Sequence, residues 1–143
     1  MDKFNFDKII KNLEKVKSDV PKRLGAATVN YFVGSFTKQG FDGKPWQPVK
    51  RQGKTGSRRN RSAILVQSGK LRREVSNSLR RANFNSIDIR VSLPYAKVHN
   101  EGLRAGRGRG FIMPKRQFIG QAKQLTVIQR SLLKSEIDKI WQG

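Results

Sequence analysis

The sequence of 143 residues contains no cysteine and only one histidine, His99. The absence of cysteine excludes disulfides and thiol chemistry, and a single histidine without thiols argues against a zinc site. No apolar run approaches the roughly 20 residues that span a membrane, and the opening stretch MDKFNFDKII lacks the apolar core of a secretory signal. We therefore expect a protein that is made in a cytoplasm and used there or in an assembly built there, without a membrane partner.

Acidic residues are also scarce. The chain has 31 Lys and Arg against 10 Asp and Glu, a net charge of +21, which is far more than solubility requires. This excess favours a polyanion or an acidic protein surface as partner, although solvated basic faces are the plain structural alternative. Arginines gather in two clusters, which are the candidate contacts with a partner or with DNA: Arg58, Arg59 and Arg61, and Arg104, Arg107 and Arg109.

Neither arginine cluster belongs to a known sequence-reading motif. No helix-turn-helix, zinc-finger or RNA-recognition signature accompanies them, and aromatic residues do not interleave with them as base-stacking proteins require. Lysine and arginine neutralise phosphates without reading bases. Any contact with nucleic acid is therefore predicted to be nonspecific and sensitive to salt.

The sequence offers little for catalysis. Its ten carboxylates are scattered, and His99 with Glu101 is a pairing that arises often by chance. The stretch GLRAGRGRG at 102–110 has no Lys-Ser/Thr after it and no apolar strand before it, so it is no phosphate-binding loop of the Walker type. We predict no catalytic, cofactor-binding or metal-binding residue, and a protein that is not an enzyme.

The length fits one domain, 1–143, with a helical N-terminal part over 1–39. Apolar residues at helical spacing predict one helix over about 5–18 and a second helix that stops at Gly40, with Pro21 either ending the first or starting the second. Residues 40–62 are rich in glycine, proline and basic residues, which indicates a long basic loop with Trp46 packed on the body.

Residues 63–119 are predicted to form a sheet core. A hairpin is expected to pair 73–82 with 86–93, because Ile87, Ile89, Val91 and Leu93 alternate with polar residues. A short helical turn carrying His99 follows, then a basic loop at 103–110, a strand at 111–113 and a C-terminal helix over 120–142. The predicted fold class is α+β: a small antiparallel sheet packed by N-terminal and C-terminal helices, with long basic loops.

Four stretches in this order resemble a known family: FDGKPWQPVKR at 41–51, ILVQSGKLRREV at 64–75, PYAKVHNEG at 94–102 and IMPKRQFIG at 112–120. Together they resemble the tailed-phage virion morphogenesis proteins, the Mu G-like and tail-completion group that includes head–tail joining proteins. The chain departs from the usual pattern at Ser68, where threonine is common, and at Lys115 and Gln117, where small residues or proline are common. The matching positions are Trp46, Pro48, Gly69, Leu71, Arg72, Tyr95, Ala96, His99, Gly102, Pro114, Arg116, Phe118 and Gly120.

The resemblance implies a structural protein of the virion, assembled in the host bacterial cytoplasm. Such subunits form homo-oligomeric rings, often six-fold, that complete the tail or join it to the capsid, and they have no catalytic residues. The implied partners are further copies of the chain, tail-tube, neck or portal-side virion proteins, and DNA touched nonspecifically in the channel. A nonspecific nucleic-acid-binding protein is the alternative, on the charge alone.

The resemblance also implies roles for single residues. Tyr95, Ala96 and His99 would pack and hydrogen-bond the short turn onto the sheet, and Pro114 and Phe118 would seat the last helix. The loop at 103–110 would reach a neighbouring subunit, a partner ring or DNA.

Overall fold

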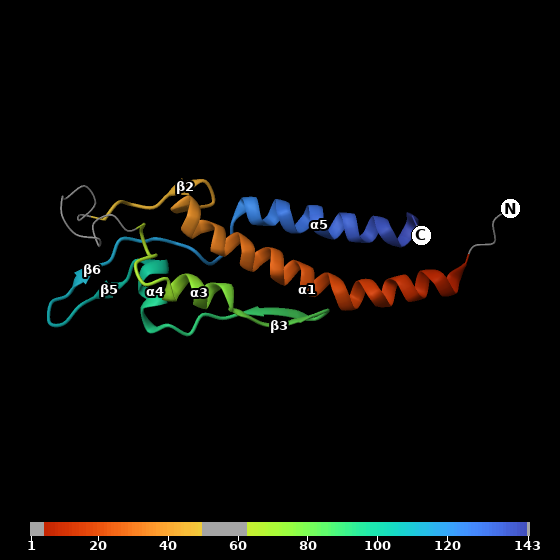
Figure 1. Ribbon diagram of the computed structural model, residues 1–143, viewed down its shortest axis with the longest axis horizontal. Helices are drawn as coiled ribbons and strands as arrows, with labels where there is room; N and C mark the ends of the chain where they lie inside the picture. The colour runs from red at the N-terminus through yellow and green to blue at the C-terminus, as the bar shows by residue number, and fades with distance from the viewer. Residues whose placement is uncertain (1–4, 50–62, 143) are drawn as a thin grey trace.

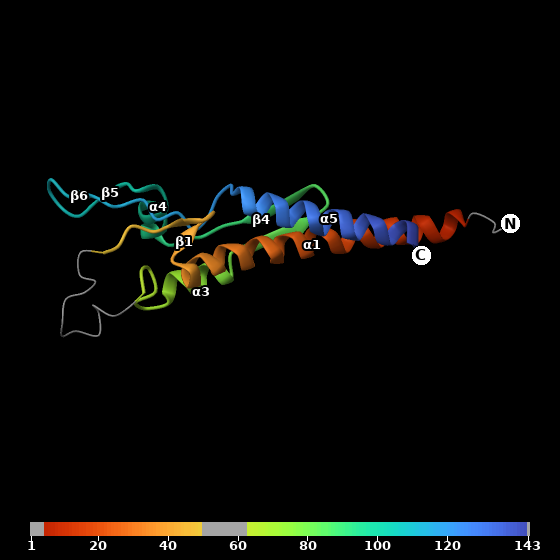
Figure 2. The ribbon, with the colours of Figure 1, turned by 90° about the horizontal axis from the view of Figure 1, so that it is seen from above.

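A computed structural model describes residues 5–49 and 63–142 of the chain. The molecule is elongated, and its long axis follows helix α1 (Phe6–Lys38) (Figure 1). At 33 residues and 1.5 Å per residue, this helix is about 50 Å long. Helix α5 (Lys123–Gln142) lies against α1 in both views, with its C-terminal end at the same end of the molecule as the start of α1 (Figures 1 and 2).

Helix α1 is one continuous helix. The side chain of Asn5 caps its start by accepting a hydrogen bond from the backbone N–H of Lys8 at 3.1 Å, and Gln39 ends it in a left-handed conformation with φ of 52°. The prediction that Pro21 separates two helices is wrong. Pro21 lies buried inside α1, since the apolar stripe continues on both sides of it and tertiary packing outweighs the one backbone hydrogen bond that a proline removes.

Polar contacts fix α5 against α1. Glu136 Oε1 accepts hydrogen bonds from Arg23 of α1 at 2.6 Å and from Lys139 of its own helix at 2.7 Å. About two turns of α5 further toward the other end of the pair, Gln129 Nε2 donates to Thr28 Oγ1 at 3.0 Å. These bonds set the register in which the two helices pack.

A hairpin lies along the other side of α1. It pairs β3 (Leu79–Asn83) with β4 (Ser86–Ile89) in antiparallel register, and its turn falls within NFNS as predicted. The close approach depends on Gly25, because a Cβ there would lie 2.8 Å from a methyl carbon of Leu79. The predicted hairpin, 73–82 with 86–93, is too long at its open end, because β3 begins only at Leu79 and β4 ends at Ile89.

The first part of that predicted strand is helical. Helix α3 (Lys70–Ser76) buries Leu71 and Val75, which are four residues apart and therefore lie on one helical face. The predicted loop at 40–62 is also corrected in part, since β1 (Gly40–Phe41) and β2 (Lys44–Pro45) form a tight hairpin at its start. Residues 50–62 of that predicted loop lie outside the described residues.

The remaining elements lie at the opposite end of the molecule from the start of α1 (Figure 2). They are α4 (Pro94–Glu101), β5 (Arg104–Ala105) and β6 (Phe111–Ile112). The strand predicted at 111–113 is thus present over two residues, pairing with β5 across the basic loop. The last helix begins at Lys123, three residues later than predicted.

The α+β fold class is confirmed, with helices at both ends of the chain packing on short antiparallel strands. One detail is wrong, because the strands described in 5–49 and 63–142 form three separate pairs instead of a single small sheet. The core lies where α1, α3, α4 and the segment before α5 meet. Its aromatic rings come from Phe32, Phe36, Phe41, Trp46 and Phe118. None of the helices in the described ranges has the length and apolar character needed to cross a membrane.

Candidate assembly surfaces

Three aromatic rings join segments that are far apart in the sequence. The Phe36 ring of α1 lies 5.6 Å from that of Trp46 and 5.5 Å from that of Phe118, measured between ring centres. Trp46 Nε1 donates a 2.7 Å hydrogen bond to the backbone carbonyl of Gln117. The predicted anchoring of Trp46 on the body is therefore seen, and Phe118, only 1 % exposed, fixes the segment that leads into α5.

Arg116 is a buried charged residue that connects two segments of the fold. Its residue is 3 % exposed, and its guanidinium donates to the carbonyls of Gln47 at 3.0 Å and Pro48 at 3.4 Å. Its backbone N–H donates to the carbonyl of His99 at 2.8 Å. Arg116 thus links the segment after Trp46 to α4, which gives it a structural position and not one on the solvent-exposed surface.

His99 contacts its surroundings by packing more than by side-chain hydrogen bonds. Its ring meets that of Tyr95 edge to face at 6.2 Å, and its Nδ1 is buried without a hydrogen-bond partner among the described residues. Burial, and the positive charge of Arg116, lower the pKa of His99 below its ordinary value. Ala96, on the same helix, is buried in the core, whereas Tyr95 is 40 % exposed.

The end of α4 shows why this stretch contains glycine. Gly102 has φ of 72° and ends the helix, and a Cβ on it would lie 2.9 Å from Lys115 Cβ. Asn100, which the sequence did not single out, holds the same junction. Its Oδ1 accepts hydrogen bonds from the backbone N–H groups of Phe118 at 2.9 Å and Ile119 at 3.0 Å.

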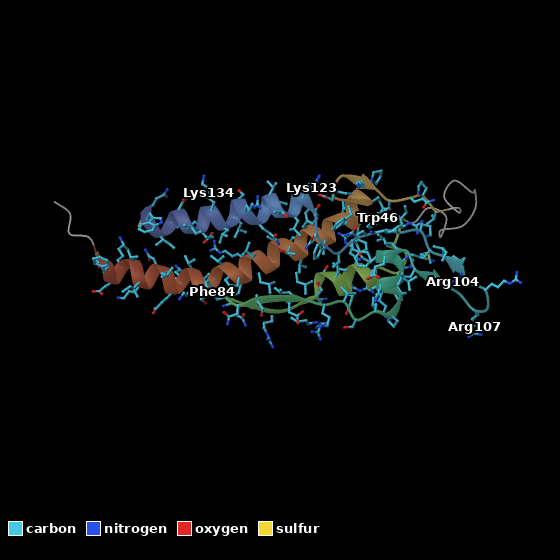
Figure 3. All side chains as sticks on the ribbon, turned by 180° about the vertical axis from the view of Figure 1, so that it is seen from behind. Trp46, Phe84, Arg104, Arg107, Lys123 and Lys134 are labelled. Atoms are coloured by element: carbon cyan, nitrogen blue, oxygen red, sulfur yellow. The ribbon has the colours of Figure 1, made fainter. Side chains whose placement is uncertain are left out.

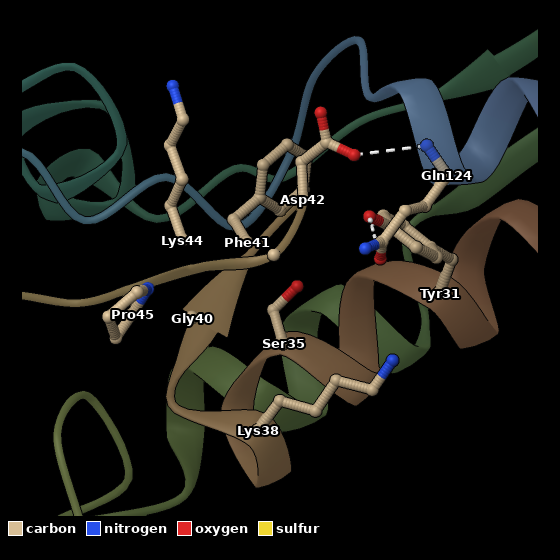
Figure 4. Close-up of a pocket in the computed structure, with 10 residues that line it drawn as sticks. Tyr31, Ser35, Lys38, Gly40, Phe41, Asp42, Lys44, Pro45 and Gln124 are labelled. Carbon is tan, nitrogen blue, oxygen red and sulfur yellow. Dashed lines mark hydrogen bonds between the residues drawn. The ribbon is translucent and has the colours of Figure 1, made fainter.

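Asp42 is a second residue that the sequence reasoning missed. Its carboxylate accepts hydrogen bonds from the backbone N–H groups of Gln124 at 3.0 Å and Lys123 at 3.1 Å, so it caps the start of α5 from the β1–β2 turn (Figure 4). Those two hydrogen bonds hold its pKa below the ordinary value. Beside it lies a cavity of about 260 Å³ lined in part by Tyr31, whose pKa is raised by burial and by the Asp42 charge.

The remaining motif residues divide between the core and the surface. Gly69 precedes α3 with φ of 67°, and Leu71 is buried in that helix. Pro114 is half-buried before Arg116, and Gly120 has φ of 138° at the turn toward α5. Arg72 is exposed, so it alone of these five is available to a partner.

The arginines of the β5–β6 hairpin form the most prominent charged projection of the described residues. Arg104, Arg107 and Arg109 are all exposed, and Figure 3 shows Arg104 and Arg107 on the hairpin at one end of the molecule. The guanidinium of Arg104 donates to the backbone carbonyl of Arg109 and so shapes the loop. Arg58, Arg59 and Arg61 of the other predicted cluster lie outside the described residues, so the structure shows only the cluster at 104–109.

A comparison with protein families matches residues 4–136 to the phage virion morphogenesis family. The chain belongs to this family. The match covers nearly the whole chain and confirms the resemblance predicted from the four motif stretches. No match was found among curated proteins, and none among solved structures.

For a phage virion morphogenesis protein, the geometry separates two kinds of residue. Most of the predicted family positions are buried or half-buried, and Trp46, Arg116 and Phe118 hold the body together. The exposed arginines stand on a hairpin outside that body. No cluster of three or more His, Asp or Glu that could hold a metal occurs within 5–49 and 63–142.

Proposed function

We propose that the chain is a ring-forming structural subunit of the virion, either at the end of the tail, where it completes or terminates the tail, or in the neck, where it connects tail and capsid. The observation that carries the proposal is the family match over residues 4–136, which already assigns a role in virion morphogenesis. The subunit acts by binding neighbours and does no bond-making chemistry. It is a component of the virion and is assembled in the cytoplasm of the host bacterium.

The shape and charge of the subunit support this role. Its core fixes α4 and the segment 112–120, from which the β5–β6 hairpin extends with three exposed arginines. When a subunit is repeated around a ring, such charges add their potentials on one rim or in the lumen. The partners that fit are acidic surfaces of tail-tube, neck or portal-side proteins, and the phosphates of DNA in the channel.

Removal of the gene and electron microscopy of the lysate test the proposal. If the subunit stops tail growth, its loss gives tails of uncontrolled length. If it joins tail and capsid, its loss gives complete tails and filled heads that remain separate, and a plasmid copy of the gene restores joining. Normal, infectious particles made without the protein would contradict both versions.

The alternative, a nonspecific nucleic-acid-binding protein, is favoured by the net charge of +21 and by the arginines on one hairpin. Binding to duplex DNA should then weaken steeply with salt. Replacing Arg107 and Arg109 by glutamine should reduce the slope of log K against log salt by about 1.8, at about 0.9 per phosphate contact.

The matched control for that experiment removes two positive charges elsewhere, with Lys11→Gln and Lys134→Gln. If the control changes the slope as much as the hairpin variant, the hairpin is no preferred contact. If wild-type protein does not bind duplex DNA even at low salt, this alternative fails, while the virion role is untouched.

A further inference from the structure

An apolar groove lies at the end of the molecule opposite the arginine hairpin. It is formed by α1, α5 and the tip of the β3–β4 hairpin, has a volume of about 500 Å³, and is lined by no charged side chain. Its walls include several large apolar side chains that are 38–69 % exposed. They are Leu13, Phe84, Ile87, Leu133 and Ile137. A contiguous apolar patch of this kind is unusual on a surface that faces only water.

The apolar face of α1 continues beyond this groove. Leu13 and Ile10 are 43 % and 53 % exposed and lie one turn apart on α1. Figures 1 and 2 both show the first turns of α1 extending past the point where α5 ends. This projecting part belongs to the same helix that forms one wall of the groove, so it cannot fold back into the groove of its own chain without breaking α1.

The three segments that form this end carry little net charge. Residues 5–19 have four lysines against three acidic residues, residues 79–89 have two arginines against one aspartate, and residues 124–142 have three basic against two acidic residues, so each segment has a net charge of +1. Residues 97–123, at the other end, carry seven basic residues against one acidic residue, a net charge of +6. Two copies of this basic chain therefore repel each other less through the end that holds the groove than through the other end, which attracts an acidic partner more strongly.

We propose that the occupant of this groove is a second copy of the chain, which inserts the projecting turns of its α1, with Ile10 as the anchor. An amphipathic helix in an apolar groove is a recurrent mode of recognition. The projecting turns and the groove are different surfaces, so the contact is head-to-tail and can propagate around a closed ring. The inference rests on the proposed role as a ring subunit and names the surfaces that build the ring.

The first test compares self-association of three full-length proteins by sedimentation velocity across a concentration series. Wild-type protein should form multimers as concentration rises. Ile10→Asp should weaken self-association by about tenfold or more, because it places a charge in the apolar contact. The matched control Ile112→Asp changes an equally exposed isoleucine, 64 % against 53 %, on β6 at the other end and should associate like wild type.

A circular dichroism spectrum should show that Ile10→Asp retains its helix content, since the side chain lies mostly in solvent in the single subunit. A wild-type protein that stays monomeric at every concentration overturns the inference. Equal association of Ile10→Asp and wild type also overturns it, as does equal loss in the Ile112→Asp control.

The second test uses the absence of cysteine from the sequence. Two single-cysteine proteins, Ile10→Cys and Ile137→Cys, are mixed and oxidised, so that any mixed disulfide joins two chains. The mixed dimer should form faster than when Arg107→Cys replaces Ile10→Cys as partner. Equal rates in the two mixtures would contradict insertion of the projecting turns into the groove.

The two proposals fail in different ways. If the protein is found in purified particles but is monomeric and unaffected by Ile10→Asp, the virion role stands, and the groove is covered by another virion protein or by nothing. If it self-associates through Ile10 but is absent from particles, the surfaces are as proposed and the virion role is wrong.

Discussion

Truncation of Phe118 tests whether the predicted family positions hold the body together. Phe118 is 1 % exposed and its ring lies 5.5 Å from that of Phe36, which in turn packs on Trp46. Phe118→Ala should cost about 3–5 kcal/mol of unfolding free energy. The upper part of that range is expected, because Asn100 holds the backbone N–H of Phe118 at 2.9 Å and limits collapse around the space left behind.

Such a loss is a large fraction of the about 5–15 kcal/mol that stabilises a typical domain. For a chain of this length it should lower the melting temperature by about 10–20 °C, measured by circular dichroism, with a matching shift of the urea midpoint. The control is Phe111→Ala, the same substitution seven residues earlier at a side chain that is 56 % exposed, which should change stability by less than about 0.5 kcal/mol. A Phe118→Ala cost below about 1 kcal/mol, or an equal cost in the control, would refute the reasoning.

Three further predictions concern single residues. Because the pKa of His99 is lowered in the folded protein, the folded state binds fewer protons than the unfolded one, so stability should fall as pH drops below about 6.5. His99→Asn should lessen that fall in urea titrations between pH 7 and 5. An unchanged pH profile in this variant would count against the role given to His99. Gly102→Ala should destabilise the protein by about 1–2 kcal/mol or more, because φ at Gly102 is 72° and Lys115 lies against the added carbon. The control Gly34→Ala adds its carbon to open space in α1 and should be neutral or stabilising. Equal shifts of the melting temperature in the two variants would contradict this prediction. Asp42→Ala should loosen the first turn of α5, seen as faster amide hydrogen exchange at Lys123 and Gln124, and unchanged exchange there would argue against capping.

The elements that the sequence predicted well have long or clean periodicity. The apolar stripes of α1 and α5 and the alternation through Ile87 and Ile89 fixed the type of each element. The prediction at Pro21 failed because proline removes one helical hydrogen bond, whereas the apolar residues on both sides of it gain more by packing as one continuous helix. Residues 73–76 misled because their weak alternation hid a stronger sign, the spacing of Leu71 and Val75 on one helical face.

One missed element carried a readable signal. The Asp42–Gly43 pair, with φ of 50° and 77°, forms the tight turn of the β1–β2 hairpin, and this dipeptide is a strong hairpin indicator between extended residues. The cap that Asp42 supplies to α5, 81 and 82 residues away, could not be predicted from the sequence. The same holds for Asn100 and for the groove, since each depends on which segments meet in space.

The arginines of the β5–β6 hairpin were identified from the sequence, whereas their place at the end opposite the groove was not. The place of each element along the molecule depends on where it packs against α1. The pattern of charges in the sequence does not predict that packing. The low net charge around the groove could have been counted from the sequence. It gains meaning only once the C-terminal part of α5 is seen to lie beside the first part of α1.

Quantitative mass spectrometry of purified, tail-bearing particles tests the central claim most directly. Labelled reference peptides of this chain and of the major tail protein would give the copies of each per particle. The account predicts a small, fixed number of copies per particle, as one ring requires. Infectious, tail-bearing particles that contain none of this chain would contradict it.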